Sequence, residues 1–219
     1  MRRWSQMAKR KYNNEFPSVT GIISQLASFG LMEWFKRTPY DEIIRESKRG
    51  KEIDTDIHSA IQNYIETGNA TVDTSYPDEV VMALNSFVAF RKDFPDIKLI
   101  RSEKELTSLK HSYNGTIDCL GEGILLDWKS AKAGDKDKPV VYDEARIQCS
   151  AYVNLVNEME GTNYDRAMIV SIAKDKVAYN TYEMNKEEID GYFNQVFLPL
   201  LGIWNFKQSQ KKEKKNGKI

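Results

Sequence analysis

The sequence predicts a mixed α/β fold in which helices cover a central β-sheet. Three observations support this prediction. Apolar residues recur at helical spacing in the first 95 residues, three strand-like stretches follow, and a helical stretch separates these from two further strand-like stretches. The 219 residues, of which 41% are hydrophobic and 29% charged, are enough for one domain with a buried core.

The helical part is predicted over residues 18–95. It begins with "FPSVTGIISQLASFGLMEWFKR", where Ser18 or Thr20 supplies an N-cap and Gly30 a break. Residues 51–67 form a clearer helix, because isoleucines recur three and four apart and a glycine follows as the stop. The segment "PDEVVMALNSFVAFRKDF" is a third helix, with acidic residues in its first turn and basic residues in its last.

The sheet-forming part is predicted over residues 96–185. The second and third predicted strands are joined by Gly-Glu-Gly, which indicates a hairpin, and "RAMIVSIA" and "VAYNTYEM" look like a second strand pair. The predicted strands before the interrupting helix are 97–107, 112–120 and 123–130, that helix is 143–159, and a last helix covers 186–206.

Both ends of the chain are basic although its formal net charge is zero. Residues 1–11 and 207–219 together hold eleven basic side chains and one acidic side chain. We therefore separate a basic N-terminal arm, residues 1–17, and a basic tail, residues 207–219, from a single domain at 18–206. The tail is predicted to be disordered, and the alternative is an arm that binds phosphates.

Cysteine content and hydropathy limit the classes of protein. The only cysteines are Cys119 and Cys149, both in apolar segments, which fits buried thiols in a reducing compartment and leaves too few ligands for an iron–sulfur cluster. No apolar run approaches the roughly 18 residues of a membrane span. We expect a soluble intracellular protein without membrane contact, and the basic start leaves an organelle-targeting segment open.

The stretch "GTIDCLGEGILLDWKSAK" places charged residues at the ends of apolar strands. Asp118 and Asp127 lie on adjacent predicted strands across a tight turn, so their carboxylates can converge, and Lys129 projects on the same side as Asp127. Two close carboxylates suit a hard cation such as Mg²⁺ or Mn²⁺, and the lysine can orient a water or offset charge on a phosphate. The alternative is a hairpin with ordinary solvent-facing charges.

The order of these motifs resembles the PD-(D/E)XK nuclease superfamily, in particular its RecB-like exonuclease branch. "GTID" contributes Asp118, "DWK" contributes Asp127 and Lys129, and "QCSAY" in the next helix contributes Gln148 and Tyr152. The branch also has an upstream helical histidine, which "DIHSAIQNYIE" offers as His58. The resemblance covers roughly residues 18–183 and implies the restriction-endonuclease-like core, a mixed sheet flanked by helices.

The resemblance also implies roles for these residues. Asp118, Asp127 and Lys129 would be catalytic, and the metal ligands would be His58, Asp118, Asp127 and the backbone carbonyl of Trp128. Gln148, Tyr152 and Lys132 would contact DNA, although Tyr152 also fits a core position, and the Trp128 side chain could pack or stack. An additional acid on the first strand would be Glu103 or Glu105.

The implied activity is metal-dependent hydrolysis of DNA phosphodiester bonds at DNA ends, in replication, recombination or repair. Mg²⁺ or Mn²⁺ would be the cofactor, without an iron–sulfur cluster and, since "GxxxxGK[ST]" is absent, without a nucleotide. The partner would be single- or double-stranded DNA, and a recombination or replication protein is also expected. The location would be the cytoplasm of a bacterium or phage-infected host, with the mitochondrial matrix as the alternative. Alternative functions are a non-cleaving nucleic-acid-binding module and a site-specific endonuclease.

Overall fold

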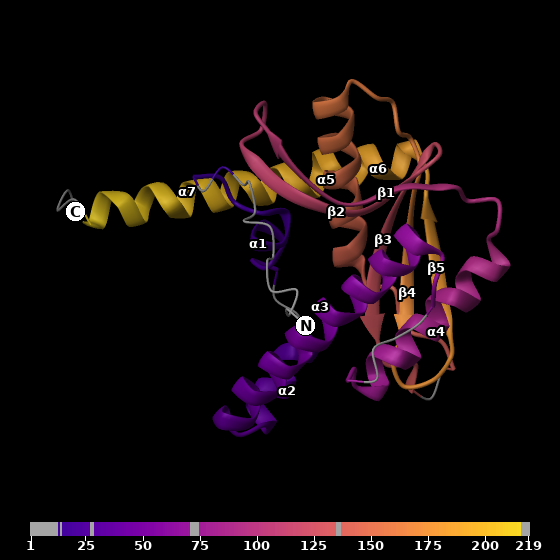
Figure 1. The fold of residues 1–219 in the computed structure, drawn as a ribbon. Coiled ribbons are helices and arrows are strands. Elements are labelled where there is room, and N and C mark those ends of the chain that lie inside the picture. The colour runs from indigo at the N-terminus through magenta and orange to yellow at the C-terminus, as the bar shows by residue number, and fades with distance from the viewer. Residues whose placement is uncertain (1–12, 14, 27–28, 71–74, 135–136, 216–219) are drawn as a thin grey trace, which may run out of the picture.

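The computed structural model describes residues 13, 15–26, 29–70, 75–134 and 137–215, which build a five-stranded sheet with helices on both faces (Figure 1). The predicted order of helices and strands is confirmed from residue 78 to residue 184. In chain order the elements are α1 (Val19–Ile23), α2 (Phe29–Arg37), α3 (Tyr40–Thr67), α4 (Asp78–Asp93), β1 (Leu99–Ser108), β2 (Tyr113–Gly121), β3 (Ile124–Ala131), α5 (Asp143–Glu160), β4 (Ala167–Ala173), β5 (Tyr179–Met184), α6 (Lys186–Tyr192), a π-helical turn (Phe193–Phe197) and α7 (Leu198–Lys215).

The sheet has the strand order β1-β2-β3-β4-β5 and is mixed. Neighbouring strands are antiparallel except for β3 and β4, which are parallel. A parallel pair requires a long crossover connection, and α5 provides it between β3 and β4. The predicted β2–β3 hairpin is confirmed, and Gly123 in its turn has a φ of 74°, a left-handed conformation that favours glycine.

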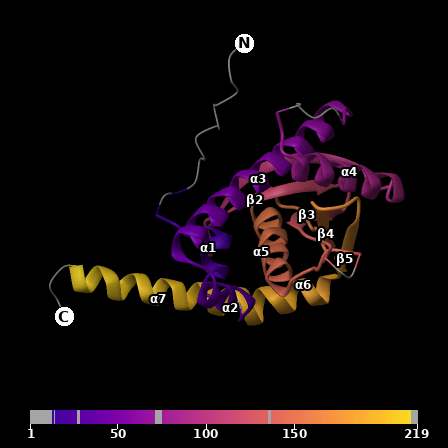
Figure 2. The same cartoon turned by 90° about the horizontal axis from the view of Figure 1, so that it is seen from below.

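Side chains on the two faces of the sheet enter two separate cores. On β3, Leu125 packs with residues of α1, α5 and α7, whereas Leu126 and Trp128 pack with residues of α3 and α4. Figure 2 shows α3 and α4 on one side of the sheet and α5, α6 and α7 on the other. Because both faces are covered, the inner strands β3 and β4 are mostly apolar, whereas the edge strands β1 and β5 carry more polar residues.

The N-terminal helices differ from the prediction in their limits. Ser18 caps α1, since its Oγ accepts a hydrogen bond of 3.0 Å from the Gly21 N–H. Gly30 lies within α2, so the expected break at this glycine is wrong. Helix α3 begins at Tyr40 instead of residue 51, and it ends as predicted at Gly68, whose φ is 70°.

The structure describes the two basic ends of the chain to different extents. Most of the N-terminal arm, residues 1–12 and 14, lies outside the described residues. The predicted disordered tail is corrected over residues 207–215, because α7 continues as a helix to Lys215, and residues 216–219 again lie outside the described part. Within the described ranges, none of the helices combines the length and apolar character that a membrane span requires.

Candidate active site

Strands β2 and β3 separate next to Asp118 and Asp127. The last paired residues in this direction are Cys119 and Leu126, and beyond them the Trp128 N–H donates to Asp118 Oδ2 at 2.8 Å. The carboxylate of Asp118 thus takes the place of a strand carbonyl at the point where the ladder ends. This bond fixes one oxygen of Asp118 and leaves Oδ1 directed toward α3.

Helix α3 places His58 over this end of the sheet. The neighbouring Ile57 and Ile61 are buried in the second core, which fixes the rotation of the helix. One turn earlier, Asp54 Oδ1 accepts a hydrogen bond of 3.0 Å from Ser130 Oγ on β3. The His58 side chain is 22% exposed as a result, and it lies between helix and sheet.

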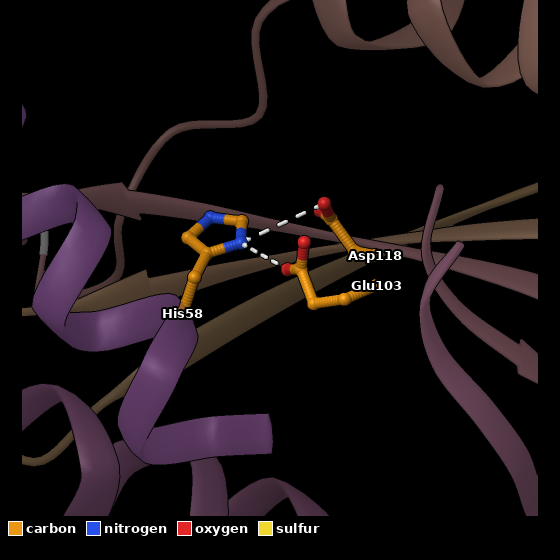
Figure 3. A group of neighbouring side chains, drawn as sticks. All are labelled: His58, Glu103 and Asp118. Carbon is orange, nitrogen blue, oxygen red and sulfur yellow. Dashed lines mark ion pairs between the residues drawn. The ribbon is translucent and has the colours of Figure 1, made fainter. Parts of the chain in front are cut away.

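His58, Glu103 and Asp118 converge from α3, β1 and β2 (Figure 3). Nδ1 of His58 lies 3.5 Å from Glu103 Oε1 and 3.6 Å from Asp118 Oδ1. One potential ligand atom from each residue lies within 4.8 Å of the others. Burial disfavours the charged imidazolium, but the acids Asp118, Glu103 and Asp54 outweigh it and raise the pKa of His58 to about 9.

Glu103 has an unusual backbone conformation within strand β1. Its φ is 49°, a left-handed value that is rare for a residue with a side chain. The flanking residues Ser102 and Lys104 keep a regular register opposite Cys119 and Ile117, so Glu103 comes directly opposite Asp118. Two acids facing each other across strands repel, and such local strain occurs most often at functional sites.

Of the two glutamates proposed on the first strand, Glu103 therefore belongs to the group and Glu105 does not. Glu105 pairs with Thr116, two positions farther along the ladder from Asp118. The sequence alone did not separate them, because both lie in one charged strand. The register of β1 against β2 would have done so, since it places position 103 opposite the motif aspartate.

Asp127 and Lys129 form a second group beside the first. Lys129 Nζ lies 2.5 Å from Asp127 Oδ2, and the Asp127 side chain has no exposed surface. Burial raises the pKa of Asp127 against the opposing effect of Lys129, and the neighbouring carboxylates of Asp127 and Asp118 raise the pKa of Lys129 despite its own burial. Asp127 is thus close to the His58 group without belonging to the set of atoms within 4.8 Å.

The donor atoms fit a small divalent cation. Imidazole nitrogen and carboxylate oxygens are ligands for Mn²⁺, and carboxylates with room for water suit Mg²⁺. Asp127 Oδ1 is buried and has no hydrogen-bond partner among the described residues, which is costly for a carboxylate unless a cation or proton satisfies it. His58, Glu103, Asp118 and Asp127 are the side chains that could hold such a cation.

The Trp128 side chain packs in the core. Its ring makes edge contacts with Phe87 and Phe90, at centroid distances of 5.1 Å and 6.1 Å, and only 2% of the residue is exposed. Of the two possibilities left by the sequence, packing is therefore the one found. The carbonyl oxygen of Trp128 accepts a hydrogen bond of 3.3 Å from Lys129 Nζ, which places it on the side of the charged groups.

Gln148 and Tyr152 are linked, as their spacing on one helix allows. Gln148 Nε2 donates to the Tyr152 hydroxyl at 2.8 Å, but Tyr152 is only 3% exposed. Tyr152 therefore takes the core position that the sequence also allowed, between α5 and β2, and its contact with DNA stays a prediction. Gln148 is partly exposed and Lys132 is exposed, which leaves both on the surface.

Both cysteines are buried free thiols, as expected. Burial raises the pKa of Cys119 to about 12 and raises that of Cys149 above its ordinary value, so neither is a reactive thiolate. His111, the second histidine, contacts the Phe193 ring at a centroid distance of 5.6 Å and lies outside the His58 group. These residues serve packing.

The chain is similar in fold to a solved structure from Eubacterium rectale that is described as a "putative exonuclease". The match covers 100% of this chain and 88% of that one, with a TM-score of 0.57 and 15% sequence identity. At this identity the likeness shows the fold, and the predicted α/β fold with a mixed sheet flanked by helices is confirmed. No family model and no curated protein matches the chain.

Two further solved structures resemble parts of the chain more weakly. An alkaline exonuclease from Laribacter hongkongensis matches with a TM-score of 0.37 and 13% identity, over 73% of this chain and 85% of that one. A phage-related exonuclease from Haemophilus somnus matches with a TM-score of 0.38 and 11% identity, over 71% of this chain and 82% of that one.

Proposed function

We propose that this chain is a metal-dependent DNA nuclease that hydrolyses phosphodiester bonds from DNA ends. The observation that carries the proposal is the convergence of His58, Glu103 and Asp118 beside the Asp127–Lys129 pair, where two strands separate. A pure binding module needs neither a buried carboxylate with an unpartnered oxygen nor a lysine beside it. The resemblance to the RecB-like branch and the described fold neighbours support the same activity.

The divalent cation would be Mg²⁺ or Mn²⁺, held by His58, Glu103, Asp118 and Asp127. When bound, it supplies activation of water and stabilisation of the negative charge that develops on the phosphate. The hydrogen bond from the Trp128 N–H holds Asp118 in place, and the Ser130–Asp54 bond holds α3 and hence His58 over the sheet. These contacts orient the ligands before the substrate arrives.

We assign to Lys129 the contacts with the attacking water and the phosphate. Its side chain is one-third exposed, and its Nζ contacts Asp127. An ammonium group at this position offsets negative charge on the phosphate and donates hydrogen bonds to a water. When Lys129 turns from Asp127 toward the phosphate, the Asp127 Oδ2 that it contacted becomes free.

Substrate contacts away from the reacting phosphate are assigned to Gln148 and Lys132. The bond from Gln148 to Tyr152 orients the glutamine amide and leaves its carbonyl oxygen and second N–H available. Lys132 follows β3 immediately and is exposed, so it can contact a phosphate without reading the base sequence. Lys136, in the same loop, lies outside the described residues.

The proposal extends to the biological setting implied by the resemblance. The substrates would be DNA ends that arise in replication, recombination or repair, in the cytoplasm of a bacterium or of a phage-infected host. A replication or recombination protein would deliver these ends.

Cleavage of end-labelled linear and closed circular DNA, single- and double-stranded, tests the activity. Mg²⁺, Mn²⁺ and EDTA are compared for the wild type, Asp118→Asn and Lys129→Ala, with Glu122→Gln on the exposed hairpin as the control. We expect metal-dependent loss of linear DNA that both site variants abolish and the control retains. Cleavage of circles would identify an endonuclease, and inert proteins that all bind DNA would identify a binding module.

A further inference from the structure

Helix α7 continues well beyond the part of the protein that it packs against. Leu200 and Leu201 are its last buried residues, and the helix runs on to Lys215. At about 1.5 Å per residue, the segment after Leu201 is about 20 Å long. Figures 1 and 2 show this segment, which we call the α7 arm (residues 202–215), extending away from the sheet and from the other helices.

One stripe of this helix changes from apolar to basic where it leaves the core. The stripe starts in the preceding π-helical turn with Phe197, which is buried like Leu200 of α7, and Trp204 is half-buried. The stripe continues at the same spacing of three and four residues with lysines. The lysines of this stripe, all exposed, are Lys207, Lys211 and Lys214. The face that attaches α7 to the core thus becomes a row of positive charges on the arm.

The lysine row is not neutralised by the protein itself. Among the described residues, no acidic side chain forms an ion pair with any of the three lysines. The one acid on the arm, Glu213, accepts a hydrogen bond from Gln210. Like charges three and four residues apart on a helix repel, so the row costs stability unless an anion binds it.

We propose that the α7 arm is a binding surface for the phosphate backbone of duplex DNA that flanks the cleaved end. The proposal rests on the nuclease function proposed above. The rest of the chain has more acidic than basic side chains, so a surface that attracts a polyanion has to be concentrated locally. A rigid row of lysines one helical turn apart provides several phosphate contacts at once without recognising a sequence.

An anionic membrane is the competing partner. Ile203 and Phe206 are exposed on the same arm, and basic helices with exposed apolar residues can bind lipid headgroups. The two residues are the only large apolar side chains exposed on the described part of the arm. DNA is favoured, because the row contains lysines alone over its last two turns.

The test compares two triple variants of the full chain that lose the same charge. The arm variant is Lys207→Gln, Lys211→Gln and Lys214→Gln, and the control is Lys92→Gln, Lys98→Gln and Lys186→Gln at exposed positions elsewhere. Lysine and glutamine have similar helix propensities, so α7 should stay helical, which circular dichroism verifies. Binding to a 30-base-pair duplex is measured in EDTA over a range of salt concentrations.

The arm variant should bind the duplex more weakly and with a flatter salt dependence. Each phosphate contact contributes about 0.9 to the slope of log K against log salt, so the slope should fall by up to about 2.7. The control should lower it by much less. With Mg²⁺, the KM for the long duplex should rise, whereas kcat/KM for the p-nitrophenyl ester of thymidine 5′-phosphate should not change.

Several outcomes would overturn the assignment. These are an unchanged slope in the arm variant, an equal loss in the control, or a loss of activity on the small ester as well. Binding to phosphatidylserine vesicles that the arm variant loses, with DNA binding intact, would reassign the arm to membranes. Because DNA binding is measured in EDTA, a wild type that binds through the arm but cleaves nothing would contradict the nuclease function alone.

Discussion

Replacing Gly115 with alanine tests the contact between β2 and α5 that lies three residues before Asp118. A Cβ at this position would lie 2.7 Å from Tyr152 Cε1 and 2.9 Å from Leu155 Cδ2. Carbon atoms prefer separations of about 3.5–4.0 Å, and both neighbours are buried. Neither side chain can move into solvent, so α5 has to move away from β2 or the two side chains have to leave their preferred rotamers.

The expected loss of stability follows from these two close contacts. Overpacking a core costs about 1–3 kcal/mol, and two simultaneous clashes with buried side chains place Gly115→Ala at about 2–3 kcal/mol. For a urea m-value of about 2 kcal/mol/M, the unfolding midpoint should fall by about 1 M or more. Gly50→Ala is the control, because its Cβ would meet nothing within 4 Å and alanine is favoured in the α3 helix.

A second substitution separates this clash from a general loss of stability. Leu155→Ala should be destabilising by about 2–5 kcal/mol in the wild type but by less in Gly115→Ala, because the new methyl group fills part of the space. Urea unfolding of the four proteins gives the coupling energy. If Gly115→Ala unfolds at the wild-type midpoint, or if Leu155→Ala costs the same in both backgrounds, the packing explanation of the motif glycine is wrong.

Three further predictions concern the site. Glu103→Gln should weaken Mn²⁺ binding in calorimetry at least about 10-fold while Glu105→Gln leaves it unchanged, and equal affinities would remove Glu103 from the ligands. In the metal-free protein the pKa of His58 is about 9, above its ordinary 6.5, so its contribution to stability is present below pH 6.5 and lost as the pH rises through 9. Unfolding in EDTA should therefore show a loss of up to about 3 kcal/mol over this range that His58→Gln removes, and equal pH profiles would contradict it. Tyr152→Phe should raise the KM for DNA with little change in kcat, because the orientation of Gln148 is lost; an unchanged KM would leave Tyr152 a packing role only.

Much of the fold follows from patterns that have one simple interpretation. The segments that became β2, β3 and β4 are apolar runs bounded by turn residues, and the stripe of Ile53, Ile57 and Ile61 allows only a helix. The hairpin glycines then bring Asp118 and Asp127 onto neighbouring strands. The proximity of Asp118, Asp127 and Lys129 could therefore be predicted from the sequence.

The first and last residues of helices were harder to predict from the sequence where polar residues dominate. Residues 40–50 contain few apolar side chains, so the first part of α3 leaves no apolar stripe in the sequence. The same is true of residues 207–215, whose lysines and glutamines are good helix formers but also typical of disordered segments. In α7, the buried residues Leu200 and Leu201 anchor the helix in the core before the basic part begins, and this favours helix over disorder.

Other features of the site depend on tertiary contacts alone. The burial of Tyr152 results from the close approach of α5 to Gly115, and the spacing of Gln148 and Tyr152 gives no indication of it. The selection of Glu103 over Glu105 depends on the register between β1 and β2. The sequence motif therefore predicted which residues lie near one another better than it predicted what each residue contacts.

Three features that the folding energy disfavours lie close together around His58. Asp127 has a buried carboxylate oxygen without a partner among the described residues, Glu103 has a φ of 49° within a strand, and this glutamate faces Asp118 across the ladder. Each feature is destabilising for the protein alone, and a bound divalent cation would relieve the unsatisfied oxygen and the repulsion between the acids together. Elsewhere, the buried side chains of Ser86 and Ser150 are hydrogen-bonded to backbone groups, whereas Gln25 Oε1 and Arg146 Nε are also buried without a partner among the described residues. Selection for stability would remove such conflicts from an ordinary hairpin, which is why their coincidence around His58 supports a catalytic site over solvent-facing charges.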